Sequence, residues 1–184
     1  MGQERKGNYI RTHCGVKFYP LDPRPEDILI EDIAHALGNT CRYTGHSEEF
    51  YSVAQHATII SYQVPEEDAL WGLLHDASEA YICDIARPVK RLPELAPYVK
   101  IEGELMAHIA TKFGLPTEMP KAVHVADNRL LVTEMQQILK CPNEDWIWIS
   151  KDYPEYHKML IVPVGPIIAK SMFLTRFKEL YEEK

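Results

Sequence analysis

The segment between Pro65 and Cys83 constrains the fold of this chain more strongly than any other, because it combines the pattern of an amphipathic helix with a cluster of charged groups. Pro65 followed by three acidic residues is typical of a helix start, since proline fits the first turn and acids favour the positive end of the helix dipole. Apolar residues then recur at helical spacing, at Leu70, Leu73, Leu74, Ala77 and Tyr81. This spacing predicts a continuous helix over 66–83.

Similar periodicity predicts further helices along the rest of the chain, over 25–39, 52–63, 98–113, 118–140 and 167–180. Ser52 and Gln55 fit a capping box at the start of the second of these, in which each side chain bonds the backbone N–H of the other. Weak alternation over 9–18 indicates a short extended arm or hairpin.

A length of 184 residues suits one domain, and neither internal repeats nor a long linker divides the chain. We therefore predict an all-α fold, a compact helical bundle spanning 1–184 with a short N-terminal arm or hairpin. Helices over about 30–140 would carry the site, and a loop and a final helix would follow over 141–184.

Charge, hydropathy and cysteine content indicate which kinds of partner the protein lacks and in which cellular compartment it lies. A net charge of −7 argues against binding to a nucleic acid polymer, although single Arg or Lys side chains can still hold a small phosphate. No apolar run approaches the roughly 20 residues needed to span a bilayer, so we expect no membrane partner. The four cysteines are scattered without a Cys-x-x-Cys pair and no secretory signal is recognisable, which predicts reduced thiols in a cytoplasmic protein.

The polar face of the 66–83 helix has the character of a site. In helical projection His75, Asp76 and Glu79 lie opposite the apolar residues, together with Gly72. A solvated face usually carries Lys or Arg, but neither occurs between Ser47 and Ile85. Because Gly72 also permits a close approach by another element, we expect this face to pack against one and to form a site rather than to meet water.

His56 and Asp127 extend this site to other helices. A lone histidine such as His56 is more often a hydrogen-bonded core residue, whereas Asp127 lies on an apolar stripe where a carboxylate needs a cation or several donors. Together with His75 and Asp76 they form a plausible ligand set for one divalent ion. Co, Mn, Zn, Fe or Mg are the candidates, with Co or Mn favoured.

These residues resemble the signature of the HD-domain phosphohydrolases, in which a histidine, a His-Asp doublet and a later aspartate recur. The wider strings Tyr51–His56 and His75–Lys90 resemble one branch, which holds the bacterial 5′-deoxynucleotidases of the YfbR type and phage dATP triphosphohydrolases. The phosphohydrolase of oxetanocin biosynthesis is similar to the same branch. The resemblance covers roughly residues 33–135 and implies an HD-domain helical bundle.

The resemblance also implies roles for individual residues. His56, His75, Asp76 and Asp127 would hold the metal. Glu79 would act on the attacking water, and Asp84 would hold the network or contact the substrate sugar. Arg42 and Tyr43 resemble an Arg-aromatic pair that contacts phosphate and nucleoside.

The chain departs from the family pattern at two positions: it has Gln55 where glutamate is frequent, and Tyr43 where the deoxynucleotidases have tryptophan. Two further substrate contacts follow from position alone. Lys90, fixed after Pro88, could neutralise phosphate at the rim of the site. His46, beside Gly45, could touch phosphate, and a solvated loop histidine is an equal alternative.

Three functions compete on this basis. The first is metal-dependent release of phosphate from nucleoside or nucleoside-analogue 5′-phosphates, including stepwise action on di- and triphosphates. The second is release of intact triphosphate from a deoxynucleotide, and the third is a non-catalytic module that binds a nucleotide. The family forms dimers, so we also expect a homodimer or a higher homo-oligomer.

Overall fold

The computed structural model describes residues 4–156 and 158–181 of the chain. These residues are mostly helical, and the small sheet is a two-stranded antiparallel hairpin of β1 (Ile10–Arg11) and β2 (Lys17–Phe18). The prediction of an all-α fold with a short N-terminal hairpin is confirmed. Among the described residues, none of the helices combines the length and the apolarity that crossing a bilayer requires.

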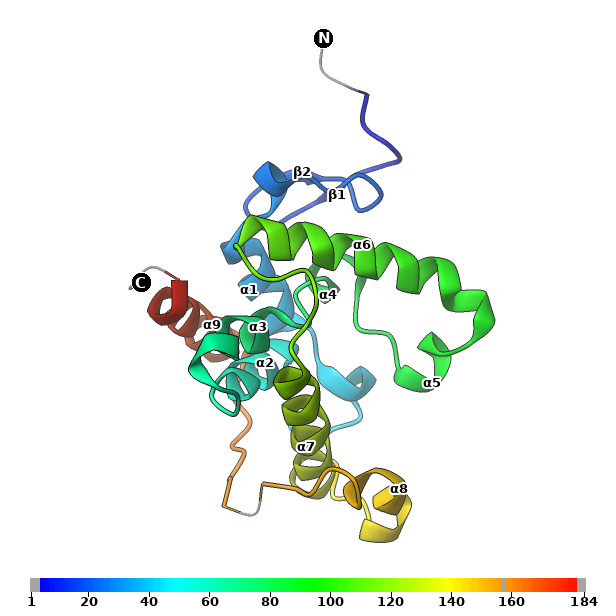
Figure 1. The fold of residues 1–184 in the computed structure, drawn as a ribbon, viewed down its shortest axis with the longest axis vertical. Coiled ribbons are helices and arrows are strands. Elements are labelled where there is room, and N and C mark those ends of the chain that lie inside the picture. The colour runs from blue at the N-terminus through cyan, green and yellow to red at the C-terminus, as the bar shows by residue number, and fades with distance from the viewer. Residues whose placement is uncertain (1–3, 157, 182–184) are drawn as a thin grey trace.

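The main core forms where four helices pack side by side: α1 (Ile30–Asn39), α2 (Val53–Ser61), α3 (Ala69–Leu74) and α9 (Pro166–Tyr181). Figure 1 shows the C-terminal helix α9 beside the helices from the first half of the chain, with the hairpin lying above them. Leu37, Leu73 and Phe173 are fully buried between these helices. The hairpin is anchored there by Phe18, whose ring stacks on Tyr81 at a centroid distance of 3.9 Å.

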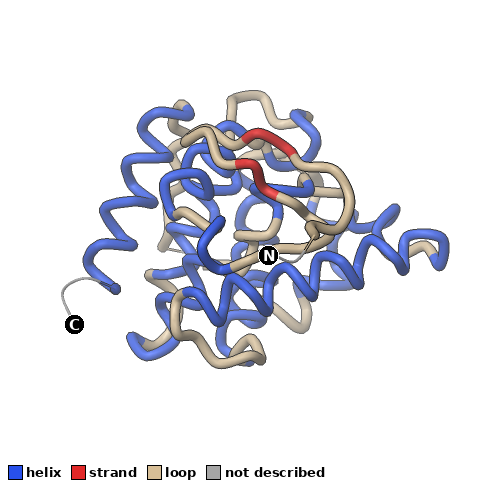
Figure 2. The backbone as a smooth tube through the Cα atoms, turned by 90° about the horizontal axis from the view of Figure 1, so that it is seen from above, coloured by secondary structure: helices blue, strands red, loops and turns tan. Residues whose placement is uncertain are grey.

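Two longer helices, α6 (Ala96–Lys112) and α7 (Lys121–Gln137), complete the fold. Leu105 and Ile109 of α6 are fully buried in the main core, whereas Leu130 of α7 belongs to a second buried cluster. In Figure 1, α6 crosses one end of the molecule while α7 runs away from it, and the two short helices α5 (Arg87–Lys90) and α8 (Ile147–Ser150) flank the space between. Seen from above in Figure 2, the hairpin covers the helices on one side. Short 3₁₀ turns connect these elements, at Pro25–Asp27, Arg42–Gly45, Glu66–Asp68, Pro93–Leu95 and Asn143–Trp146.

Two predicted helices differ from the observed ones. The helix expected from residue 25 begins only at Ile30, because Ile28 and Leu29 are extended. The helix expected over 66–83 ends at Leu74 and resumes as α4 (Glu79–Ile82), which stops where Cys83 adopts a left-handed φ of 73°. Tight i→i+3 backbone bonds over 74–81 replace the α-helical pattern. Such turns eclipse residues three apart, so Asp76 and Glu79 still point the same way.

Of the two hydrogen bonds predicted for the capping box at the start of α2, only one is confirmed. Ser52 caps the helix, since its hydroxyl accepts a hydrogen bond from Gln55 N at 3.1 Å. The prediction of a reciprocal bond from the Gln55 side chain to the backbone of Ser52 is wrong, because the Gln55 side-chain amide bonds another segment. It donates to Val162 O at 2.8 Å and accepts from Val164 N at 3.0 Å, and so ties the segment before α9 to α2.

We predict that Gly72→Ala lowers the free energy of unfolding by about 1–3 kcal/mol, the usual cost of overpacking. A Cβ at Gly72 would lie 3.1 Å from Ser61 Cα and 3.2 Å from Val64 Cγ2, where α3 meets α2. Urea denaturation measures the change. The matched control is Gly103→Ala in α6, where a Cβ meets no described atom within 4 Å and the better helix propensity should stabilise by up to about 1 kcal/mol. Equal effects of the two substitutions would contradict the close approach.

Candidate metal centre

Three of the predicted metal ligands come together in the fold. His56 lies in α2, while His75 and Asp76 follow α3, and their ligand atoms all lie within 4.8 Å of one another. His75 Nε2 is 3.1 Å from Asp76 Oδ2, and His56 Nε2 is 3.8 Å from the same oxygen. These three side chains form a group that could hold a metal ion.

Both imidazole rings are oriented by their second nitrogen. His56 Nδ1 lies 2.6 Å from Glu134 Oε1, and His75 Nδ1 lies 2.8 Å from Gly72 O. A hydrogen bond donated by Nδ1 fixes the tautomer that leaves Nε2 as the metal ligand. Within the described ranges, both Nε2 atoms are buried without a hydrogen-bond partner, which is the arrangement that a ligating histidine needs.

Asp127 adjoins the group of three from α7. Its Oδ1 is 3.2 Å from His56 Nε2, and its Oδ2 is 3.6 Å from Arg87 Nη2. The structure thus brings the fourth predicted ligand to the edge of the group, on the side of His56.

Glu134, which the sequence analysis missed, holds much of the site together. It is fully buried in α7 and accepts hydrogen bonds from four side chains: Arg42 (3.0 Å), Tyr43, Tyr51 (2.7 Å) and His56 (2.6 Å). Its position seven residues after Asp127 places both carboxylates on one face of the helix, and this spacing was the signal in the sequence. Glu134 therefore links the metal group to the predicted phosphate-binding arginine.

The electrostatics of the group favour added positive charge. Burial and the nearby Arg42 charge oppose protonation of His56, but Glu134 and Asp127 outweigh them and raise the pKa of His56 to about 9. Despite burial, Arg42 and His56 lower the pKa of Glu134 to about 2, and His75 lowers that of Asp76. Without a metal, a proton on His56 supplies this positive charge, and a divalent cation would replace it.

Glu79 and Asp84 lie beside the metal group in a cleft of about 450 Å³, hereafter the inner cleft. Glu79 is buried, and its Oε2 has no hydrogen-bond partner in the described part of the chain. Burial, together with the charges of Asp76 and Asp84, raises the pKa of Glu79 well above its ordinary value. Burial also raises the pKa of Asp84, with Arg42 opposing it. A carboxyl group of this kind is suited to proton transfer.

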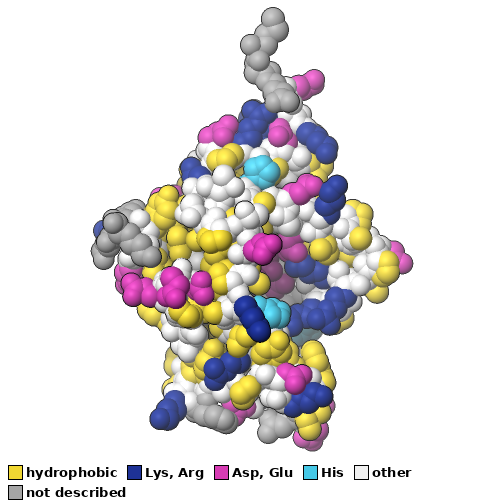
Figure 3. Space-filling view, in the orientation of Figure 1, with side chains coloured by type: hydrophobic (Ala, Val, Ile, Leu, Met, Phe, Trp, Pro, Cys, Tyr) yellow, Lys and Arg dark blue, Asp and Glu magenta, His cyan; other side chains and the backbone are white. Residues whose placement is uncertain are grey.

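Basic side chains line the inner cleft in a protein of net negative charge: Arg42, Arg87, Lys90 and Arg91. Figure 3 shows Lys and Arg side chains gathered next to Asp and Glu in a hollow of the surface. Arg42 Nη1 is 3.8 Å from Asp76 Oδ2, and Lys90 Nζ is 2.5 Å from Glu102 Oε1. Arg87 and Arg91 were missed in the sequence, where the run of basic residues after Asp84 was their signal.

The two remaining substrate candidates differ in position. Tyr43 lines the inner cleft, and the backbone of Tyr43 and Thr44 is left-handed, with φ of 56° and 51°. Its hydroxyl is bound to Glu134. His46 is exposed and is not among the residues that line the inner cleft, so the structure does not bring it to the site.

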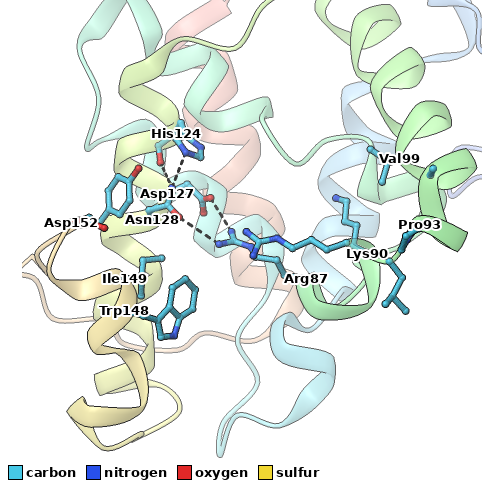
Figure 4. Close-up of a pocket in the computed structure, with 14 residues that line it drawn as sticks. Arg87, Lys90, Pro93, Val99, His124, Asp127, Asn128, Trp148, Ile149 and Asp152 are labelled. Atoms are coloured by element: carbon cyan, nitrogen blue, oxygen red, sulfur yellow. Dashed lines mark hydrogen bonds and ion pairs between the residues drawn. The ribbon is translucent and has the colours of Figure 1, made fainter.

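A second cavity of about 870 Å³, hereafter the outer cavity, opens beside the inner cleft. Figure 4 shows its two sides, with His124, Asp127, Asn128, Trp148 and Ile149 on one and Arg87, Lys90, Pro93 and Val99 on the other. Arg87 reaches across, with Nη1 at 3.5 Å from Asn128 Oδ1. Sequence analysis did not predict this cavity.

Comparison with known proteins finds relatives that match most of the chain. The chain is 40% identical to the protein YfdR of Escherichia coli (strain K12) over 175 residues, which covers 95% of this chain and 97% of YfdR. It is 36% identical to a protein of Rhodobacter capsulatus over 146 residues, which covers 72% of this chain and 74% of that protein. Neither relative's name states an activity. No protein-family model matches the chain.

Proposed function

The chain belongs to the family of the Escherichia coli protein YfdR, and we propose that it is a divalent-metal-dependent hydrolase of nucleoside 5′-phosphates that acts as an HD-domain phosphohydrolase. The observation that carries the proposal is that the buried Nε2 atoms of His56 and His75, which make no hydrogen bond among the described residues, lie together beside Asp76. The basic inner cleft next to them supports phosphate as the group acted upon.

The residues present fit a divalent ion, since two imidazoles and two carboxylates match the ligands that Mn, Fe, Co and Zn accept. His56, His75, Asp76 and Asp127 would hold it, and we propose Co²⁺ or Mn²⁺ as the ion. When bound, such an ion polarises a phosphoryl oxygen and acidifies water. Glu134 and Gly72 O would keep the two imidazoles in the ligating tautomer.

The remaining steps fall to side chains of the cleft. Glu79 accepts the proton of the attacking water, because a buried carboxylate with a raised pKa is a stronger base than an exposed one. Arg42 and Lys90 neutralise the charge that spreads over the phosphoryl oxygens. Both start in ion pairs, with Glu134 and Glu102, which hold them at the edge of the cleft. Asp84, which also lines the cleft, would hold the network or contact the sugar.

A panel of nucleotides with the Co²⁺- or Mn²⁺-loaded protein tests this proposal. Orthophosphate released from dAMP supports a 5′-nucleotidase, and triphosphate released from dATP alone supports the alternative triphosphohydrolase. Binding without turnover on the whole panel would instead identify a non-catalytic nucleotide-binding module and overturn the proposed hydrolysis. Light scattering after size exclusion tests the homodimer, which stays a prediction.

We predict that Glu79→Ala lowers kcat by about 10²–10⁴-fold, the usual contribution of a positioned general base. The metal should remain at wild-type stoichiometry, because Glu79 is not part of the group of three ligands. Phosphate release and metal analysis of the same sample measure both quantities. Glu118→Ala, at an exposed position, is the matched control and should leave both unchanged. Loss of the metal together with activity would contradict the role of Glu79 as a base.

A further inference from the structure

The outer cavity has two walls of different chemistry. One wall, from α7 and α8, presents the aromatic rings of His124, Trp148 and Tyr153. The opposite wall presents Arg87, the first residue of α5 (Figure 4). Arg91, which follows α5, also lines the cavity. An aromatic wall facing a cationic wall suits a ligand that combines a flat ring with negative charge.

The outer cavity is continuous with the inner cleft. Five residues line both spaces: Arg87, Lys90, Arg91, Asp127 and Trp148. Because Asp127 also adjoins the metal group, a ligand whose phosphate lies at His75 and Asp76 can extend past Asp127 into the outer cavity. The two cavities fall within the 300–1,000 Å³ that small-molecule sites usually have.

The aromatic surface offered to a base differs from the one that sequence reasoning favoured. The hydroxyl of Tyr43 is bound to Glu134, and its ring packs against the buried clusters around Leu130 and Leu131. The side chain of Trp148 is 52% exposed and lines both cavities. Trp148 therefore has a larger accessible ring surface at a position that a nucleotide can reach.

We propose that the outer cavity is the nucleobase-binding part of the site and that Trp148 supplies its stacking surface. This inference rests on the proposed function and deepens it, since it names the part of the nucleotide that each cavity takes. Arg91 faces the cavity from the other wall, is exposed and has no side-chain partner in the described part of the chain. It can cover the second face of the base.

Asn128 and Arg87, which line the outer cavity, are held in place by hydrogen bonds and ion pairs. Asn128 is 4% exposed, and its amide donates to His124 O at 2.8 Å while its oxygen faces Arg87 Nη1 at 3.5 Å. Arg87 also contacts Asp127 and so joins the outer cavity to the metal group. A base resting on Trp148 would meet polar groups that are held in place before it binds, which lowers the cost of binding.

Calorimetric titration with a nucleoside 5′-phosphonate, which cannot be hydrolysed, tests the inference on the Mn²⁺-loaded protein. Trp148→Ala should raise the Kd roughly 10- to 100-fold, as loss of base–aromatic stacking does. Trp148→Phe should recover most of the affinity, because a ring remains. Ile147→Ala, on the same short helix but outside both cavities, is the matched control and should bind as the wild type does.

Titration with inorganic phosphate separates a base contact from a general disturbance of the site. The ratio of phosphonate to phosphate Kd should rise in Trp148→Ala and also in Arg91→Gln. Equal phosphonate affinity of the wild type and Trp148→Ala would overturn the inference, and so would a parallel loss of phosphate affinity. Because binding is read without turnover, a Trp148-dependent affinity in a protein that hydrolyses no nucleotide would overturn the proposed hydrolysis alone.

Discussion

His75→Ala should abolish both metal binding and phosphate release. His75 supplies one of the two imidazole nitrogens that point at Asp76, and its side chain is 5% exposed, so water cannot easily replace it. With only one imidazole left, His56, Asp76 and Asp127 should not hold a divalent ion against dialysis, and without the ion the water and the phosphate lose their activation. Elemental analysis after dialysis and a phosphate assay measure the two losses.

Thermal unfolding adds a readout that does not depend on activity. A metal that binds the folded state at 100 times its Kd stabilises the wild type by about 2.7 kcal/mol, and this gain should vanish in His75→Ala. His108→Ala in α6 is the matched control, since the His108 side chain bonds only Glu104 O within the described residues and is half-buried away from the metal group. A His75→Ala protein with stoichiometric metal would contradict the assigned centre.

The three candidate ligands His56, His75 and Asp76 can be predicted from sequence because each is a polar group inside an apolar pattern. His75 and Asp76 stand out in this way even though the helix that was expected to carry them is interrupted there. The periodicity predicts which face is polar, but the tight turns after Leu74 depend on packing around the site. The order of the helices could therefore be predicted from the sequence, whereas the local geometry of the site could not.

Residues whose roles depend on tertiary contacts cannot be identified from local sequence patterns. Glu134 becomes important only because Arg42 and Tyr51, which are 92 and 83 residues earlier in the chain, meet it in the fold. Arg87 and Trp148 come from separate short helices, and neither sequence segment shows that they share a cavity. Local hydrophobic and charge patterns do not show which residues far apart in the sequence meet in the fold.

Glu134→Gln should lower the stability of the metal-free protein by about 3–5 kcal/mol, the usual cost of breaking a buried ion pair. The substitution keeps the shape of the side chain but leaves the Arg42 guanidinium without its carboxylate partner. It also removes the negative charge that holds the proton on His56 Nδ1. Metal affinity should therefore fall about 10- to 100-fold, as it does when the partner of a ligating histidine is lost. Urea denaturation and metal titration measure the two effects.

The pH dependence of this loss identifies its cause. The pKa of Glu134 is lowered from an ordinary value of 4.5 to about 2, so the stability that its charge contributes is present above pH 4.5 and is lost as the pH falls toward 2. The stability gap between the wild type and Glu134→Gln should narrow over this window. Glu104→Gln, at a 60% exposed position paired only with Lys100 among the described residues, should change stability by less than about 0.5 kcal/mol. A gap that stays constant from pH 5 to pH 2 would contradict a charge contribution of Glu134, because such a contribution disappears when the carboxylate is protonated.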